Sequence, residues 1–175
     1  KYALIVAGGT GTRLGAKIPK QMLPVAGRPI LAHTISRFLD LDADMIVVVV
    51  LHASLLDGWA SFCEAQFAAE EHPRLHVCAG GPNRTTSVRL GLAKLGDLGV
   101  DPQGLVAVHD GVRMFADGDM LQRGFAMAAT HGNATAAVPV KSSLRQKSAG
   151  GSKAVNRSEY YHVQTPQIFR LEALS

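Results

Sequence analysis

The sequence predicts an α/β fold with a mostly parallel sheet, because continuous apolar runs alternate along it with segments of helical periodicity. The clearest runs cover residues 2–6, 45–51 and 105–108, the last of which is followed by His109. Runs of this length and composition are typical of strands that are covered on both faces. Strands that alternate with helices require crossover connections, and such crossovers pair the strands in parallel.

Helices are expected between these runs, on both faces of the sheet. Pro29 suits the first turn of a helix, and the apolar residues after it recur on one face. Ser54 is expected to cap a second helix that carries apolar residues as far as Phe67. A third helix should follow the glycine turn at residues 80–81. Asp119 is expected to cap a fourth helix that runs to about residue 130.

Two shorter strands are predicted at residues 75–78 and 134–140. The stretch that follows them is polar and contains a Gly-Gly turn, which predicts a protruding β-arm over about residues 139–162. Its composition leaves two interpretations open, a disordered insertion or an arm that embraces a second subunit.

The bulk properties suit one globular domain over residues 1–175. Hydrophobic residues make up 47% of the chain and charged residues 18%, which is enough apolar material for a full core. The longest apolar run, residues 45–51, is too short to cross a membrane, and we expect neither a targeting signal nor a membrane segment. Cys63 and Cys78 have no metal-ligand spacing, so we expect two reduced thiols in a cytoplasmic protein.

The net charge of +4 comes from basic residues that are scattered along the chain and not interleaved with aromatic residues. An anionic small molecule explains the excess as well as nucleic acid does, and we expect no nucleic-acid partner. The seven histidines have no metal-site spacing. No arrangement for nucleophilic catalysis emerges from the sequence.

The strongest chemical signal follows the first apolar run directly. Residues 7–15 are Ala-Gly-Gly-Thr-Gly-Thr-Arg-Leu-Gly, and residues 19–21 are Pro-Lys-Gln. Glycine lets a ligand approach the backbone closely, and successive main-chain N–H groups in such a turn form a concave anion site. Arg13, Lys17 and Lys20 add full positive charge. The spacing matches neither a Walker loop nor the dinucleotide fingerprint, and it predicts a site for the phosphates of a nucleotide.

Polar residues also follow the other predicted strands. Because the carboxyl ends of parallel strands meet at one edge, the turn at residues 80–81 and Asp110 should gather near the glycine loop. Asp110 is a candidate ligand for a metal or a ribose, or a simple turn former. Arg113 is suited to gripping a phosphate in bidentate fashion. Ser87 either caps the next helix or contacts a base.

These features favour phosphoryl or nucleotidyl transfer, in which positioning and charge stabilisation carry most of the catalysis. A phosphate oxygen of one substrate would attack the α-phosphorus of a nucleoside triphosphate, and pyrophosphate would leave. We expect Arg13 and Lys20 to hold the triphosphate, with Mg²⁺ assisting. A phosphate nucleophile is already ionised at neutral pH, so the reaction requires no general base.

Six motifs, in order along essentially the whole chain, resemble the cytidylyltransferases of the isoprenoid-precursor pathway. They cover residues 7–21, 80–88, 109–113, 138–143, 156–157 and 164–169. The resemblance implies a Rossmann-like nucleotidyltransferase fold, CTP as co-substrate, Mg²⁺, and a homodimer joined by the arm. It implies methylerythritol phosphate as the acceptor. A ribitol phosphate cytidylyltransferase and a non-catalytic nucleotide-binding relative are the alternatives.

The resemblance also assigns roles by position on the nucleotide side of the site. Arg13 and Lys20 would grip the triphosphate and stabilise the transition state. The backbone cradle would be formed by Ala7, Gly8, Gly9 and Gly11. Gly81 and Ser87 correspond to the cytosine pocket, while Asp110 and Gly111 match the position near the ribose and the metal.

The acceptor side is assigned in the same way. It corresponds to Arg113, Ser143, Arg157 and Thr165, of which Ser143 and Arg157 would reach across from the partner's arm. The sequence departs from the family pattern at four places without losing a required charge: Pro82, Met114, Ser143 and Asn156. The family pattern continues beyond Ser175 with a helix, a Thr-Asp segment and a strand that bears a phosphate-binding lysine. We expect this segment to be missing from the present chain.

Overall fold

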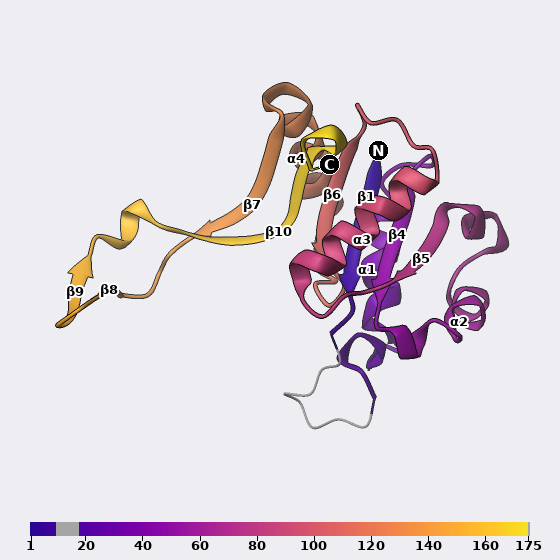
Figure 1. Ribbon diagram of the computed structural model, residues 1–175, viewed down its shortest axis with the longest axis horizontal. Helices are drawn as coiled ribbons and strands as arrows, with labels where there is room; N and C mark the ends of the chain where they lie inside the picture. Colours follow the sequence, from indigo (N-terminus) through magenta and orange to yellow (C-terminus); the bar gives the residue numbers. More distant parts are fainter. Residues whose placement is uncertain (10–17, 175) are drawn as a thin grey trace.

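The computed structural model describes residues 1–9 and 18–174, and its centre is a six-stranded sheet in the order β5-β4-β1-β6-β10-β7 (Figure 1). Strands β5, β4, β1 and β6 pair in parallel, which confirms the α/β fold with a mostly parallel sheet. The strands are β1 (Tyr2–Ala7), β4 (Ile46–Leu51), β5 (Leu75–Ala79), β6 (Leu105–Asp110), β7 (Asn133–Pro139) and β10 (Tyr161–Arg170).

The three apolar runs form the middle of this sheet. β1 lies between β4 and β6, and its residues 2–5 are buried. β4 is buried from Val47 to Leu51, with no exposed surface at any of these positions. A strand with neighbours on both sides and helices over both faces is covered by protein, which favours apolar side chains and accounts for the apolar runs.

Helices cover both faces of the sheet, as the sequence predicts (Figure 1). Phe38 and Phe125, from α1 and α4, pack with Ile5 on one face. Leu95, from α3, packs with Leu4 on the opposite face. The α-helices of the described residues are α1 (Ile30–Leu39), α2 (Trp59–Gln66), α3 (Arg84–Asp97) and α4 (Gly118–His131). No helix among the residues that the structure describes is long and apolar enough to span a membrane.

Two helix caps differ from the sequence predictions. Ser54 does not cap a helix, because it lies inside the short 3-10 helix η3 (Ala53–Leu55), where its N–H is bonded by His52. The α-helix that follows starts only at Trp59 and ends before Phe67, which is extended. Trp59 packs against the core from the helix, and Phe67 lies in the core from the extended segment after it. The spacing of the apolar residues therefore predicted a helix that is longer than the observed one.

Aspartate and asparagine side chains start the two long helices. Asp117, not Asp119, caps α4, and its Oδ1 accepts a hydrogen bond from the N–H of Met120 at 2.7 Å. Asn83 caps α3 in the same way, accepting from the N–H of Thr86 at 2.8 Å. Both caps satisfy an N–H group that the first helical turn leaves unbonded.

Strand β10 was not expected from the sequence. It runs antiparallel between β6 and β7, and its pairing register with β7 shifts between Val163 and Gln167. Its first three residues are exposed, polar and apolar residues are mixed along its first half, and Pro166 interrupts the run, so neither an apolar stretch nor a clean alternation marks it. The strand nevertheless carries residues 164 and 165 to the edge of the sheet where β6 ends.

The polar stretch after β7 forms a separate two-stranded hairpin of β8 (Leu144–Ser148) and β9 (Gly151–Val155). Figure 1 shows this hairpin far from the helices and the main sheet, at the end of two extended chains that leave β7 and enter β10. Arg145 braces the hairpin by donating to the hydroxyl and the carbonyl of Ser152. The remaining short elements are η2 (Lys20–Met22), β2 (Pro24–Val25), β3 (Arg28–Pro29), η4 (Ala69–Arg74), η5 (Arg157–Glu159) and η6 (Leu171–Leu174).

Gly91 lies where α3 packs against the sheet. A Cβ atom added there would stand 2.2 Å from Cδ1 of Leu4 and 2.8 Å from Cγ2 of Val50, two residues with no exposed surface. We expect Gly91→Ala to lower the free energy of unfolding by about 1–3 kcal/mol, because overpacking displaces both neighbours.

Gly96, on the same helix, is the matched control, since its added Cβ would meet nothing within 4 Å. We expect Gly96→Ala to raise the free energy of unfolding by up to about 1 kcal/mol through helix propensity. Urea unfolding of the two variants beside the unsubstituted protein measures both changes. Equal effects of the two substitutions would contradict the close contact at Gly91.

Candidate active site

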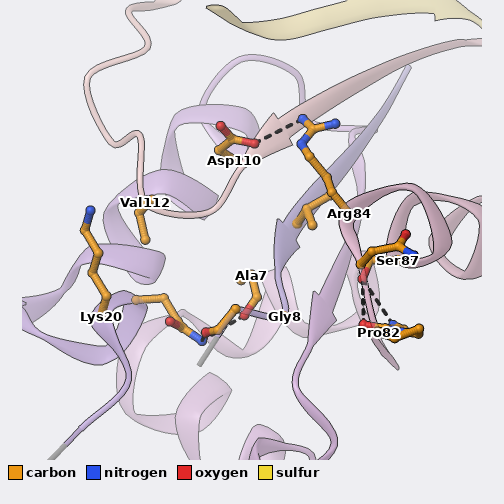
Figure 2. A pocket seen from close by; sticks show the side chains of 13 residues that line it. Ala7, Gly8, Lys20, Pro82, Arg84, Ser87, Asp110 and Val112 are labelled. Carbon is orange, nitrogen blue, oxygen red and sulfur yellow. Dashed lines mark hydrogen bonds and ion pairs between the residues drawn. The ribbon is translucent and has the colours of Figure 1, made fainter. Parts of the chain in front are cut away.

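A pocket of about 360 Å³ lies beyond the carboxyl ends of the parallel strands (Figure 2). It brings together the start of the glycine loop, the turn after β5 and the end of β6, which the sequence order keeps far apart. This edge of an open α/β sheet is where such folds bind ligands. The lining residues are Val6, Ala7, Gly8, Gly9, Lys20, Gln21, Gly81, Pro82, Asn83, Arg84, Ser87, Asp110 and Val112.

Lys20 stands on one side of this pocket, opposite Ser87 and Pro82 (Figure 2). It is an exposed residue in the short helix η2, which is closed by hydrogen bonds from Met22 N–H to Pro19 and from Leu23 N–H to Lys20. Three described backbone positions of the glycine loop, residues 7–9, lie at the pocket floor. A cation beside glycine backbone is a combination that suits a phosphate group.

The turn after β5 is held tightly against the start of α3. The hydroxyl oxygen of Ser87 accepts a hydrogen bond from the N–H of Gly81 at 3.1 Å. A Cβ atom at Gly81 would stand 2.4 Å from Cγ2 of Thr86, and one at Gly80 would stand 3.2 Å from the carbonyl oxygen of Leu51. Glycine is therefore needed at position 81 for the close approach of this turn, and position 80 leaves little room for a Cβ atom. Ser87 orients the turn in place of capping α3.

Asp110 lies at the end of β6 between two arginines. Its carboxylate accepts from Arg84 Nη2 at 3.0 Å and from Arg113 Nε at 2.8 Å. Burial favours a higher pKa for this carboxyl, but the hydrogen bonds from Arg113 and Arg84 and their charges outweigh it, and the pKa lies below its ordinary value. The side chain is thus ionised at neutral pH and links an arginine of the nucleotide pocket to one outside it.

Arg113 and Thr165 line a second pocket of about 390 Å³, which shares Val112 with the first. Arg113 also donates to the side-chain oxygen of Gln164, so its guanidinium is held from two sides. The N–H of Asp110 donates to the hydroxyl of Thr165 at 3.3 Å. Thr165 and Gln164 of β10 are therefore hydrogen-bonded to the end of β6, the first to the N–H of Asp110 and the second through Arg113.

His109, one residue earlier in β6, is fully buried and bonds the carbonyl of Arg113 through Nε2 at 2.9 Å. Burial lowers the pKa of this histidine, so the ring is neutral at pH 7 with its proton on Nε2. The interaction fixes the turn that carries Arg113.

The structure brings most of the predicted nucleotide-site residues together. Those that line the pocket are Ala7, Gly8, Gly9, Lys20, Gly81, Ser87 and Asp110. Gly111 lies behind the pocket wall, where its N–H bonds the carbonyl of Val6 and an added Cβ would stand 2.7 Å from that of Ala7. Gly11 and Arg13 lie outside the described residues.

The predicted acceptor residues are divided between two places. Arg113 and Thr165 line the second pocket, whereas Ser143 and Arg157 lie on the arm, exposed and among the lining of neither pocket. Arg157 instead donates to the carbonyl of Lys141. Within one chain, therefore, the arm residues do not meet the other two.

Several pocket residues were not predicted from the sequence. Arg84 and Gln21 stand inside two of the six motifs, but their residue type and position alone predict no role for either. Gln164 stands in such a motif too, and its role depends on β10, which was not predicted. Val6 and Val112 contribute apolar walls and carry no chemical signal of their own.

The fold and the pocket together define a class. An open, mostly parallel α/β sheet with glycine backbone, a lysine and an ionised aspartate at its carboxyl edge is typical of Rossmann-like proteins that bind nucleotides.

Comparison with known proteins identifies the family within this class. The family model of 2-C-methyl-D-erythritol 4-phosphate cytidylyltransferase (IspD) matches residues 2–175. The chain is 42% identical over 171 residues to the enzyme of that name from Bacteroides thetaiotaomicron, covering 98% of this chain and 74% of the relative. It is 43% identical over 175 residues to the one from Porphyromonas gingivalis, covering 99% and 74%. The chain belongs to this family.

Solved structures of enzymes with this name have the same fold as the chain. The crystal structure of 2-C-methyl-D-erythritol 4-phosphate cytidylyltransferase from Francisella tularensis superposes with a TM-score of 0.74 at 25% identity. The match covers 98% of this chain and 72% of that one. The Rossmann-like nucleotidyltransferase fold expected from the sequence is confirmed.

Asp110→Asn tests the charged bridge between the two arginines. Because the carboxyl pKa is lowered in the folded protein, its ionised form stabilises the fold above its unfolded pKa of about 3.9. That contribution is lost as the pH falls through the folded pKa. We expect the unsubstituted protein to be more stable than the variant by up to about 1 kcal/mol at pH 7.

The difference in stability between the two proteins should shrink as the pH is lowered below about 4. There the carboxyl of the unfolded chain becomes protonated while that of the folded protein is still ionised. Chemical unfolding of both proteins across this range measures it. A difference that stays constant with pH would show that the charge of Asp110 does not contribute to stability.

Proposed function

We propose that the chain transfers the cytidylyl group of CTP to 2-C-methyl-D-erythritol 4-phosphate. An oxygen of the acceptor's phosphate attacks the α-phosphorus, the bond from that phosphorus to the bridging oxygen of the β-phosphate breaks, and pyrophosphate leaves. The observation that carries the proposal is the meeting of Gly8, Lys20 and Asp110 at one strand edge in a chain of this family.

Charge stabilisation by the pocket supplies the catalysis in this reaction. The backbone of Gly8 and Gly9 cradles the triphosphate, and Lys20 offsets the charge that grows on the phosphoryl oxygens and on the leaving pyrophosphate. Arg13 shares this task, by the family resemblance. Gly81 and Ser87 form the floor on which the cytosine rests, since their mutual hydrogen bond fixes the backbone there.

Mg²⁺ suits this site as an ion held chiefly by the substrate. The described residues contain no group of three or more His, Cys, Asp or Glu side chains that could hold a metal by themselves. Mg²⁺ commonly binds through one or two carboxylates together with substrate phosphates and water, and Asp110 provides one ionised carboxylate at the pocket rim. The ion would neutralise part of the triphosphate charge.

The second pocket is the place we assign to the acceptor. Arg113 and Thr165 bind its phosphate or hydroxyl groups beside the nucleotide, because the two pockets share Val112 and the Asp110 bridge. Ser143 and Arg157 join them from the arm of a second chain in a homodimer. Support comes from the arm's projection away from the helices and the main sheet (Figure 1), and from the absence of both residues from the lining of either pocket of their own chain.

A cytoplasmic location accords with the two thiols. Cys63 is buried and Cys78 half-buried, both are free, and burial raises the pKa of Cys63 to about 11. Protonated, unpaired thiols of this kind are usual in a reducing compartment.

Turnover with two acceptors tests the function. Purified chain with CTP and Mg²⁺ should release pyrophosphate with 2-C-methyl-D-erythritol 4-phosphate, and at least about tenfold more slowly with ribitol 5-phosphate, whose hydroxyl and methyl pattern differs. A coupled pyrophosphate assay measures both rates. Preference for ribitol 5-phosphate would overturn the acceptor assignment, and CTP binding without turnover would favour the non-catalytic alternative.

Lys20→Ala should lower turnover by about a hundredfold or more, the scale for losing one contact to transition-state charge. Lys94→Ala is the matched control, since Lys94 lies on α3 and does not line the pocket. The control should keep the unsubstituted rate. Equal rates for Lys20→Ala and the unsubstituted protein would refute the role of Lys20.

Mixing two inactive variants tests the homodimer. If Arg157 acts in the partner's site, Arg157→Ala and Lys20→Ala chains, unfolded together and refolded, should regain about a quarter of full activity. Half of the dimers would then be mixed, and each mixed dimer would hold one intact site. No regain of activity would show that Arg157 does not work in trans.

A further inference from the structure

Gln21 is a buried polar side chain at the pocket floor that the proposed mechanism does not use. It is 2% exposed, and its Nε2 donates to the carbonyl of Ala7 at 2.8 Å and to that of Gly9 at 3.2 Å. A side-chain amide has two N–H protons, and here both are directed to backbone carbonyls of one short segment. The two hydrogen bonds of Gln21 therefore depend on the backbone conformation of residues 7–9.

These hydrogen bonds set the direction of the cradle backbone. In a trans peptide the C=O and the following N–H point in opposite directions. With the carbonyl of Ala7 turned to Gln21, the N–H of Gly8 is directed away from Gln21. The amide of Gln21 therefore determines where one of the cradle's N–H groups points.

The same residue carries Lys20 next to it in η2. The turn is closed by hydrogen bonds from the N–H of Met22 to the carbonyl of Pro19 at 2.9 Å and from the N–H of Leu23 to that of Lys20 at 3.2 Å. A single side chain thus connects the strand end that offers backbone N–H groups with the turn that offers the cation.

We infer that Gln21 is a positioning residue that holds the Gly8–Gly9 backbone and Lys20 in fixed relation for a bound triphosphate. The inference rests on the proposed function of this pocket. Glutamate cannot take its place at neutral pH, because an ionised carboxylate only accepts hydrogen bonds and would face two carbonyl oxygens. An apolar residue would leave the buried carbonyl of Ala7 and the partly buried carbonyl of Gly9 without this donor.

Gln21→Met keeps the length of the side chain and removes both donors. We expect CTP affinity to fall by about tenfold and turnover by about 10–100-fold, because a small misplacement of a binding group is costly in rate. KM for the acceptor should stay within about twofold, since the acceptor pocket does not contain Gln21. Calorimetry with CTP and the pyrophosphate assay give the three quantities.

Gln21→Glu supplies a readout that loss of stability alone would not give. Burial beside carbonyl oxygens raises the pKa of the new carboxyl, and its protonated form donates one hydrogen bond. Turnover of this variant, relative to the unsubstituted protein, should rise by about fivefold or more as the pH is lowered from about 8.5 to about 6. If Gln21→Met does not fold, this pH series carries the test.

Arg74→Met is the matched control for loss of two donors. Arg74 donates through Nη1 to the carbonyls of Leu39 at 3.5 Å and Asp42 at 3.2 Å, where β5 begins at the opposite edge of the sheet. This control should lower the melting temperature and leave CTP affinity and turnover unchanged.

Unsubstituted affinity and turnover in Gln21→Met, or a flat relative pH profile in Gln21→Glu, would overturn the inference. The proposed function fails separately, through absence of product from the unsubstituted protein. If the unsubstituted protein forms no product, the difference in CTP affinity between it and Gln21→Met still tests the role of Gln21.

Discussion

The pairing of β1 with a parallel strand on each side is the constraint on which the site depends. Ala7 stands opposite Leu51 of β4, and Val6 stands opposite Asp110 of β6. This register fixes how far each strand extends before the chain leaves the sheet. The backbone of Gly8 and the carboxylate of Asp110 therefore end at the same edge, although about a hundred residues separate them in the sequence.

Close packing of backbone, more than any single side chain, gives the pocket its shape. A Cβ at Gly81 would collide with Thr86, and one at Gly111 would stand 2.7 Å from that of Ala7 and 3.2 Å from Cδ1 of Leu31. Interiors packed this tightly do not yield to an added methyl group without displacement of their neighbours. Glycine is needed at these positions for the approach of one turn to another, and the nucleotide pocket is the space that remains between them.

The sequence predicts the parts of the molecule in which a local pattern decides the structure. The central strands follow from apolar runs, and the grouping of residues 8, 81 and 110 follows from the rule that parallel strands end together. Helix starts were harder to predict, since Asp117 and Asp119 are equally good caps by composition, and in the structure Asp117 is the cap while Asp119 lies in the first turn of α4.

β10 and the role of Gln21 could not be found in this way. The first depends on pairing with β6 and β7, which lie at least 50 residues and 20 residues earlier in the chain. The second depends on two carbonyl groups whose directions no sequence pattern reports.

Electrostatics explains why an aspartate stands among groups that we assign to phosphates. A carboxylate repels both anionic substrates, so its charge alone would weaken their binding. Its hydrogen bonds, however, use one donor of Arg84 and one of Arg113, and a guanidinium has five. The remaining donors keep their positive field and are held at a fixed angle, as bidentate binding of a phosphate requires. Asp110 thus lowers the electrostatic attraction for the anionic substrates but fixes the orientation of the two guanidinium groups. Because two positive charges meet one negative charge, the group of three side chains keeps a net positive charge.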